Sequence, residues 1–197
     1  RSSLLGSLLQ VLKFNQARKQ SRVRVFELGR VFLRDASVKS TDSTVEGFDQ
    51  PMRVAGLASG SADALQWGRK EQGVDFFDVK GDVEALLAPL QGRFVPGNHP
   101  SMHPGRCAQV LLDERVIGHV GELHPQWRQT FDLAQAPVLF ELDLDAVQQR
   151  RVAIFKPVAK LQPVQRDIAV VVADDVTHAA LMAAIWAAPT SGLLRDA

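Results

Sequence analysis

Apolar and polar positions along the chain follow two periods, one typical of helices and one typical of strands. Leucine and valine recur at helical spacing over residues 4–12, after two serines that are both able to cap a helix. Further helices are predicted over residues 75–90, over residues 124–131 with Pro125 in the first turn, and after a capping Thr177. Short apolar runs predict strands at residues 23–28 with a continuation at 31–33, and at 52–58, 108–112, 116–120, 138–144 and 168–172.

Polar segments separate these elements. Residues 34–50 lack periodicity and are predicted to form a surface loop, and residues 96–105 have turn chemistry throughout. Asp113-Glu114 lies between two strands and predicts a hairpin. Strands and hairpins with irregularly placed helices indicate an α+β fold, with a mainly antiparallel sheet flanked by helices. The sequence has no G-x-G-x-x-G turn, which disfavours a doubly wound nucleotide-binding fold.

A domain boundary is predicted near residue 152. Residues 150–163 are basic and contain Pro157 and Pro163, which is typical of a linker. The strand and helix predicted beyond it are too few to close a core. We therefore assign residues 1–152 to one domain, and residues 153–197 to a linker and the start of a second, truncated domain. Because the chain starts within a helical pattern and without Met, we expect it to be a piece of a longer protein.

Composition indicates a globular protein, with 46% hydrophobic and 23% charged residues. No apolar run approaches the ~18–20 residues that cross a bilayer. The single Cys107 excludes an internal disulfide and fits a reducing compartment such as the cytoplasm.

The net charge of +1 conceals an uneven distribution. Residues 1–40 carry nine Lys and Arg against two acids, residues 41–149 carry eight against sixteen, and residues 150–166 carry five against none. The two basic stretches are candidates for phosphate contacts, which gives one hypothesis, a stand-alone RNA-binding module. The commoner explanation of such stretches is a solvated surface.

Several residues invite a catalytic or metal-binding interpretation. His99-x-x-x-His103 has zinc-like spacing if helical, but Pro100 and Pro104 prevent a regular helix, so a structured turn is favoured. The dense carboxylates of residues 75–82 would suit a divalent cation, or simply a helix capped by Asp78.

Two pairs of side chains suggest a small hydrolase. Glu122 and His124 would form an acid/base pair, although His124 is also placed to start a helix. Cys107 with His103 would form a nucleophile and base, although a Cys within an apolar strand is usually inert. The hydrolase hypothesis requires His99, His103, Glu122 and His124 to converge on one cleft.

Six strings, in order along the chain, resemble one family. They are Arg-Ser-Ser-Leu-Leu-Gly-Ser-Leu-Leu at 1–9, Phe-Glu-Leu-Gly-Arg-Val-Phe at 26–32, Val-Asp-Phe-Phe-Asp-Val-Lys-Gly-Asp-Val-Glu at 74–84, His-Pro-Gly-Arg at 103–106, Gly-x-x-Gly-Glu-Leu-His-Pro at 118–125, and Lys-Leu-Gln-Pro-Val-Gln-Arg-Asp-Ile-Ala-Val-Val-Val at 160–172. The first five resemble the C-terminal half of bacterial phenylalanyl-tRNA synthetase beta subunits, and the sixth resembles the opening of that subunit's ferredoxin-like anticodon-binding domain.

The resemblance implies a class II synthetase-like core that is non-catalytic and packs against a catalytic alpha subunit. It implies an assembly of two alpha and two beta subunits that attaches phenylalanine to its tRNA with ATP and magnesium, in the cytoplasm and without a membrane. The family's editing domain has no counterpart in these residues, so no editing site is carried over.

The sequence fits a non-catalytic core. Class II chemistry needs an arginine on the ATP α-phosphate, from a motif resembling Phe-Arg-x-Glu. Here the stretch reads Phe32-Leu-Arg-Asp35, which displaces Arg34 by one position and to the other strand face. The strand at residues 140–144 carries no second arginine. We therefore name no catalytic, cofactor-binding or metal-binding residue and expect no cofactor on this chain.

Three basic residues at the start of the second domain are candidates for RNA contact. They are Lys156, Lys160 and Arg166. Arg166 would equally serve a structural role by pairing with Asp167 or another neighbour, and we favour that role.

Overall fold

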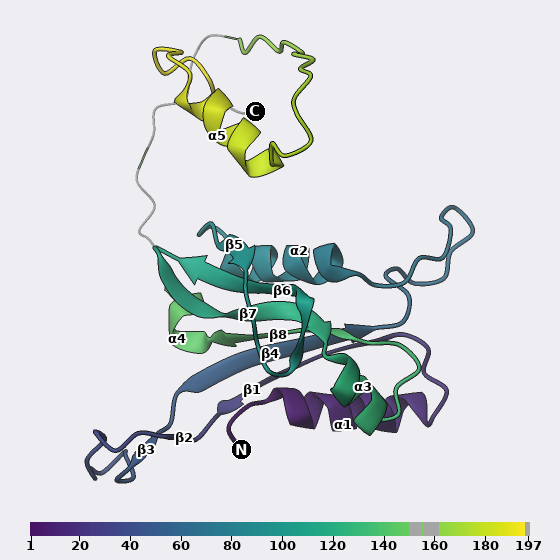
Figure 1. Ribbon diagram of the computed structural model, residues 1–197, viewed down its shortest axis with the longest axis vertical. Coiled ribbons are helices and arrows are strands. Elements are labelled where there is room, and N and C mark those ends of the chain that lie inside the picture. The colour runs from purple at the N-terminus through teal and green to yellow at the C-terminus, as the bar shows by residue number, and fades with distance from the viewer. Residues whose placement is uncertain (150–154, 156–161, 196–197) are drawn as a thin grey trace. The chain divides into compact units, whose positions relative to one another are not determined.

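The computed structural model describes residues 1–149, 155 and 162–195 (Figure 1). The chain divides into two compact units, Arg1–Ala153 and Ile154–Ala197. Among the described residues, no helix combines the length and the apolar character that crossing a bilayer requires.

The first unit is built on a six-stranded sheet with strand order β1-β4-β8-β7-β6-β5. Its strands are β1 (Val23–Arg30), β4 (Met52–Ser59), β5 (Arg93–Pro96), β6 (Met102–Leu112), β7 (Arg115–Leu123) and β8 (Val138–Asp143). Every neighbouring pair is antiparallel, so the predicted α+β fold with an antiparallel sheet is confirmed. A two-stranded sheet of β2 (Leu33–Arg34) and β3 (Phe48–Asp49) interrupts the predicted loop at residues 34–50.

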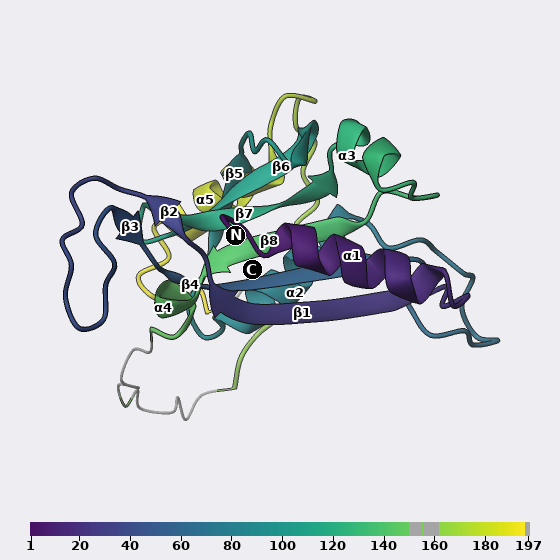
Figure 2. The same ribbon diagram turned by 90° about the horizontal axis from the view of Figure 1, so that it is seen from below.

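Helices cover both faces of the larger sheet (Figures 1 and 2). Helix α1 (Leu5–Gln16) lies on one face, and its leucines share a core with Ala55, Leu57 and Leu139. Helix α2 (Phe76–Leu87) lies on the other, where its valines pack with Val54 and Leu142. Short helices α3 (Pro125–Thr130) and α4 (Leu144–Val147) follow β7 and β8. Consecutive strand residues thus enter different cores, as the period of two requires.

The predicted apolar face of α1 is correct except at Val11. The leucines at 5, 8, 9 and 12 are buried, whereas Val11 is 40% exposed. Of the two candidate capping serines, Ser3 accepts a hydrogen bond from the Leu5 N–H at 3.1 Å. Ser3 lies one residue before the N-cap position, which is Leu4.

The cap of α2 is one turn earlier than predicted. Asp75, not Asp78, is the N-cap, and its carboxylate accepts from the N–H groups of Phe77 and Asp78. Asp78 reaches back to the N–H of Asp75 and completes a capping box. The prediction was wrong because it placed the cap at the second carboxylate of the pair instead of the first.

The prediction that residues 96–105 form turns throughout was wrong. Pro96 ends β5, and β6 begins at Met102, paired with Leu123, before a shift of register ahead of Cys107. Pro104 and Gly105 are tolerated there because that irregularity leaves the ladder unpaired. The hairpin at Asp113-Glu114 is confirmed, and both residues have positive φ, at 48° and 63°.

The second unit contains helix α5 (His178–Ala187), capped as predicted by Thr177, whose hydroxyl accepts from the Ala180 N–H. The strand predicted at residues 168–172 is wrong, because these residues are exposed and have no regular secondary structure. An isolated apolar run has no neighbouring strand in the described residues to satisfy its backbone groups.

Candidate functional site

Strand β1 forms one edge of the large sheet and carries apolar side chains on both of its faces. Phe26 and Leu28 lie opposite Gly56 and Val54 of β4 and therefore project on the α2 side. They are 74% and 53% exposed. A monomer gains nothing from two large apolar side chains in solvent on an open sheet edge, so this surface is a candidate interface.

The packing beneath β1 explains why these side chains stay uncovered. Phe140 of β8 lies across Gly56, where a Cβ atom would come within 2.4 Å of its ring. Phe140 thus fills the space that would otherwise receive Phe26. Helix α2 is joined to β1 by the ion pair of Asp82 with Arg24, at 2.7 Å, whereas its apolar face packs with Val54 and Ala58 of β4. The α2 core ends at β4, and β1 extends beyond it.

The opposite face of β1 is fastened to α1. Glu27 accepts from Ser7 at 2.5 Å and pairs with Arg1. The hydrogen bond from Ser7 and the charge of Arg1 outweigh burial and lower the pKa of Glu27. These contacts hold β1 against the α1 side, while Phe26 and Leu28 on its other face remain exposed.

The residues of the hydrolase hypothesis have separate local partners. The Nδ1 atom of His103 accepts from the Gly105 N–H, and that of His124 accepts from the Gln126 N–H as the N-cap of α3. Glu122 pairs with Arg106 at 2.6 Å. These contacts fit the structural interpretation of each residue.

Cys107 is packed as an apolar side chain. Its Sγ atom lies 3.6 Å from Sδ of Met102, and burial raises the pKa of the thiol. A raised thiol pKa opposes thiolate formation. Nothing in this geometry activates Cys107 as a nucleophile.

The structure reveals a histidine pair that the sequence analysis missed. The rings of His99 and His119 lie 5.0 Å apart between centroids, and burial lowers the pKa of both. His119 lies opposite Glu141 in the β7–β8 register. Nδ1 of His99 accepts from the Ser101 N–H, so the ring proton sits on Nε2. His119 stands in an apolar strand pattern, so no sequence signal linked it to His99.

No group of three or more His, Cys, Asp or Glu side chains in the described residues is arranged to hold a metal ion. The carboxylates of residues 75–82 are used in the capping box and in the Arg24 pair. Arg34 is exposed on β2, outside the six-stranded sheet.

Of the predicted RNA-binding residues, Lys156 and Lys160 lie outside the described residues. Arg166 is exposed and donates to the carbonyl oxygen of Gln165 at 3.2 Å. Within the described part of the chain it forms no ion pair with Asp167, and the neighbour that it contacts is Gln165, so both its structural role and its RNA-binding role stay predictions. Its cationic group is open to solvent.

Comparison with known proteins identifies relatives over most of the chain. A family profile described as "Phenylalanyl tRNA synthetase beta chain CLM domain" matches residues 1–144. The chain is 53% identical over 176 residues to a phenylalanine–tRNA ligase beta subunit of Ralstonia nicotianae, which covers 89% of this chain and 22% of the relative. It is 50% identical over 196 residues to that of Chromobacterium violaceum, which covers 100% of this chain and 24% of the relative. The chain therefore spans about a quarter of the length of the relatives it matches.

Proposed function

From the premise that this chain belongs to the phenylalanyl-tRNA synthetase beta chain family, we propose that it is a non-catalytic scaffold for a catalytic alpha subunit. Its fold is a class II synthetase-like core, followed by the start of a ferredoxin-like anticodon-binding domain. The parent complex is a phenylalanine–tRNA ligase of two alpha and two beta subunits that uses ATP and Mg²⁺ in the cytoplasm. The fragment alone is inactive in aminoacylation.

The observation that carries the proposal is the uncovered apolar row of β1. Phe26 and Leu28 offer two large side chains beside an open strand edge, which suits a partner that buries the row. Glu27, on the other face, keeps β1 fixed to α1, so docking needs little ordering of the strand. The displaced Arg34 is consistent with a supporting rather than a catalytic role.

The test is to mix this chain with purified phenylalanyl-tRNA synthetase alpha subunit and to measure mass by size exclusion with light scattering. We expect the unmutated chain, called the parent chain below, to form a complex with the alpha subunit. Phe26→Asp/Leu28→Asp should weaken it at least about a hundredfold, since burying an unpaired charge in an apolar interface costs several kcal/mol.

A matched control is Val45→Asp/Leu65→Asp, which introduces the same charges at exposed apolar positions off the β1 edge. The control should bind as the parent does. Absence of any complex with the parent chain, or equal loss in both double variants, would contradict the proposed interface.

A further inference from the structure

One end of the first unit gathers basic side chains from two segments that are distant in sequence. Lys13, Arg18, Lys19 and Arg22 belong to the end of α1 and the turn into β1, and Arg69 and Lys70 belong to the loop between β4 and α2. All six are exposed. We call this set the basic tip. Its two segments, residues 13–22 and 61–73, carry only two carboxylates, Asp63 and Glu71.

The sheet register brings the two segments together. Val23 at the start of β1 pairs with Ser59 at the end of β4, so the turn before β1 and the loop after β4 leave the same end of the sheet. Arg22 donates to the carbonyl oxygen of Ala62 at 3.2 Å. Gly60, at φ +89°, lies so close to Ser21 that a Cβ atom would be 1.8 Å from its carbonyl oxygen. The two segments of the basic tip therefore contact each other at their bases, at one end of the sheet.

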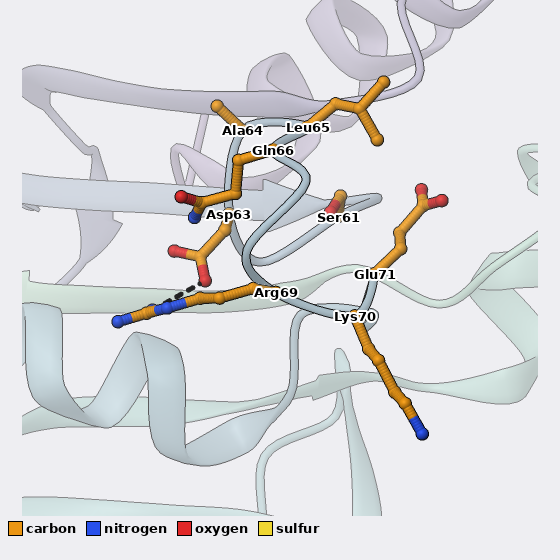
Figure 3. Close-up of a pocket in the computed structure, with 8 residues that line it drawn as sticks. All are labelled: Ser61, Asp63, Ala64, Leu65, Gln66, Arg69, Lys70 and Glu71. Atoms are coloured by element: carbon orange, nitrogen blue, oxygen red, sulfur yellow. Dashed lines mark hydrogen bonds and ion pairs between the residues drawn. The ribbon is translucent and has the colours of Figure 1, made fainter.

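The loop of the basic tip is held at its base and open at its end. The Ala62 N–H donates to Gln72 and the Val74 N–H donates to Gly60, both at 2.8 Å. Arg69 pairs with Asp63 across the loop at 2.9 Å, and Lys70 extends away from that pair (Figure 3). The loop thus offers the charge of Lys70 without a partner among the described residues.

Aromatic residues alternate with these cations along both segments, since Phe14 follows Lys13 and Trp67 precedes Arg69 and Lys70. Trp67 is fully exposed, and Leu65 beside it is 91% exposed. The guanidinium of Arg18 lies 3.3 Å from the ring centroid of Phe14, which is itself half exposed. Exposed rings between lysines and arginines match RNA, because phosphates take the cations and an unpaired base stacks on an indole.

We propose that the basic tip is an RNA-binding surface, with Lys19 and Lys70 on phosphates and Trp67 stacked on an unpaired base. The inference rests on the proposed function, since a tRNA ligase brings tRNA to its beta subunit. It assigns RNA contact to the first unit, in addition to the Lys156, Lys160 and Arg166 region. The excess of cations favours a polyanion over an apolar protein partner.

The test uses the 197-residue chain and a labelled phenylalanine tRNA transcript, with binding followed by fluorescence anisotropy between about 50 and 200 mM salt. Lys19→Glu/Lys70→Glu should weaken binding about tenfold or more and reduce the salt slope by about one to two. Trp67→Ala should weaken binding about tenfold and leave the salt slope unchanged, because stacking releases no counterions.

The matched control is Arg34→Glu/Lys39→Glu, which reverses two exposed charges around the β2–β3 sheet, at the other end of the large sheet (Figures 1 and 2). It should change the affinity by no more than about twofold, through long-range charge alone. The proposal is overturned if the parent chain fails to bind tRNA, or if the tip variants and the control behave alike.

Alpha-subunit binding separates this inference from the proposed function. Tip variants that lose tRNA while keeping the alpha subunit support an RNA surface. Tip variants that lose the alpha subunit while keeping tRNA make the tip a protein interface and overturn the proposal. A chain that binds tRNA through the tip but never binds the alpha subunit contradicts the scaffold function and leaves the RNA surface standing.

Discussion

The backbone N–H of Leu4 donates to Oε1 of Glu141 at 2.6 Å, across 137 residues of sequence. The hydroxyl of Ser3 donates to the same oxygen at 3.1 Å. A carboxylate from the sheet thus satisfies the start of α1, where no local side chain caps Leu4. The contact ties the position of α1 to β8.

Glu141→Ala should lower the free energy of unfolding of the first unit by about 1–2 kcal/mol, the usual cost of losing a cap with a charged acceptor. Glu141→Gln keeps an acceptor oxygen and should lose less. Urea unfolding of the three proteins gives the comparison. Equal losses for Ala and Gln would show that the Leu4 contact contributes little.

Gly60 permits the close approach of the two segments of the basic tip. Gly60→Ala should destabilise the first unit by about 2 kcal/mol or more, since the left-handed φ costs roughly 1–2 kcal/mol and the Cβ clash adds to it. Gly68→Ala is the control, because its Cβ would meet nothing within 4 Å. Its effect should stay within about 0.5 kcal/mol, and thermal or urea unfolding distinguishes the two.

Acid should destabilise the first unit through His99 and His119. Both have a pKa lowered from 6.5 by burial, and His119 also faces the charges of Glu141 and Arg53. Below about pH 6.5 these imidazoles are protonated in the unfolded chain, but in the folded chain they bind a proton only at lower pH. The free energy of unfolding therefore falls as pH falls. The lowered pKa of Glu27 acts in the same direction at lower pH.

His119→Gln should therefore flatten the decline in stability between about pH 7 and pH 5.5, measured by urea unfolding at each pH. His178→Gln, in the second unit, should leave the profile of the first unit as it is. An unchanged slope in His119→Gln would show that His119 is protonated as readily in the folded as in the unfolded chain.

Local signals predicted most of the elements and the fold class. Helix-forming and helix-capping signals involve residues only a few positions apart, so they are visible in the sequence. Examples are the leucines of α1, Pro125 at the start of α3 and Thr177 before α5. β5 and α4 were not predicted. Four residues of β5 are too short for a visible period, and its pairing with β6 decides it.

The candidate interface was visible only in part. Phe26 and Leu28 read as ordinary members of an apolar strand, because the sequence does not tell an edge strand from a central one. The strand order places β1 at the edge, and the ring of Phe140 occupies the space over Gly56. The exposure of Phe26 and Leu28 therefore depends on the strand order and packing of the whole sheet.

Local sequence was enough to establish the period of each main element, the antiparallel α+β class, the family strings and the basic character of residues 1–40. These depend on neighbours along the chain, whose spacing is covalently fixed. The folded sheet was needed to show that Glu141 contacts Leu4, that His99 lies against His119, and that the segments of Lys19 and Lys70 share one end of the sheet. Such contacts depend on strand order and register, which arise from the packing of the whole sheet.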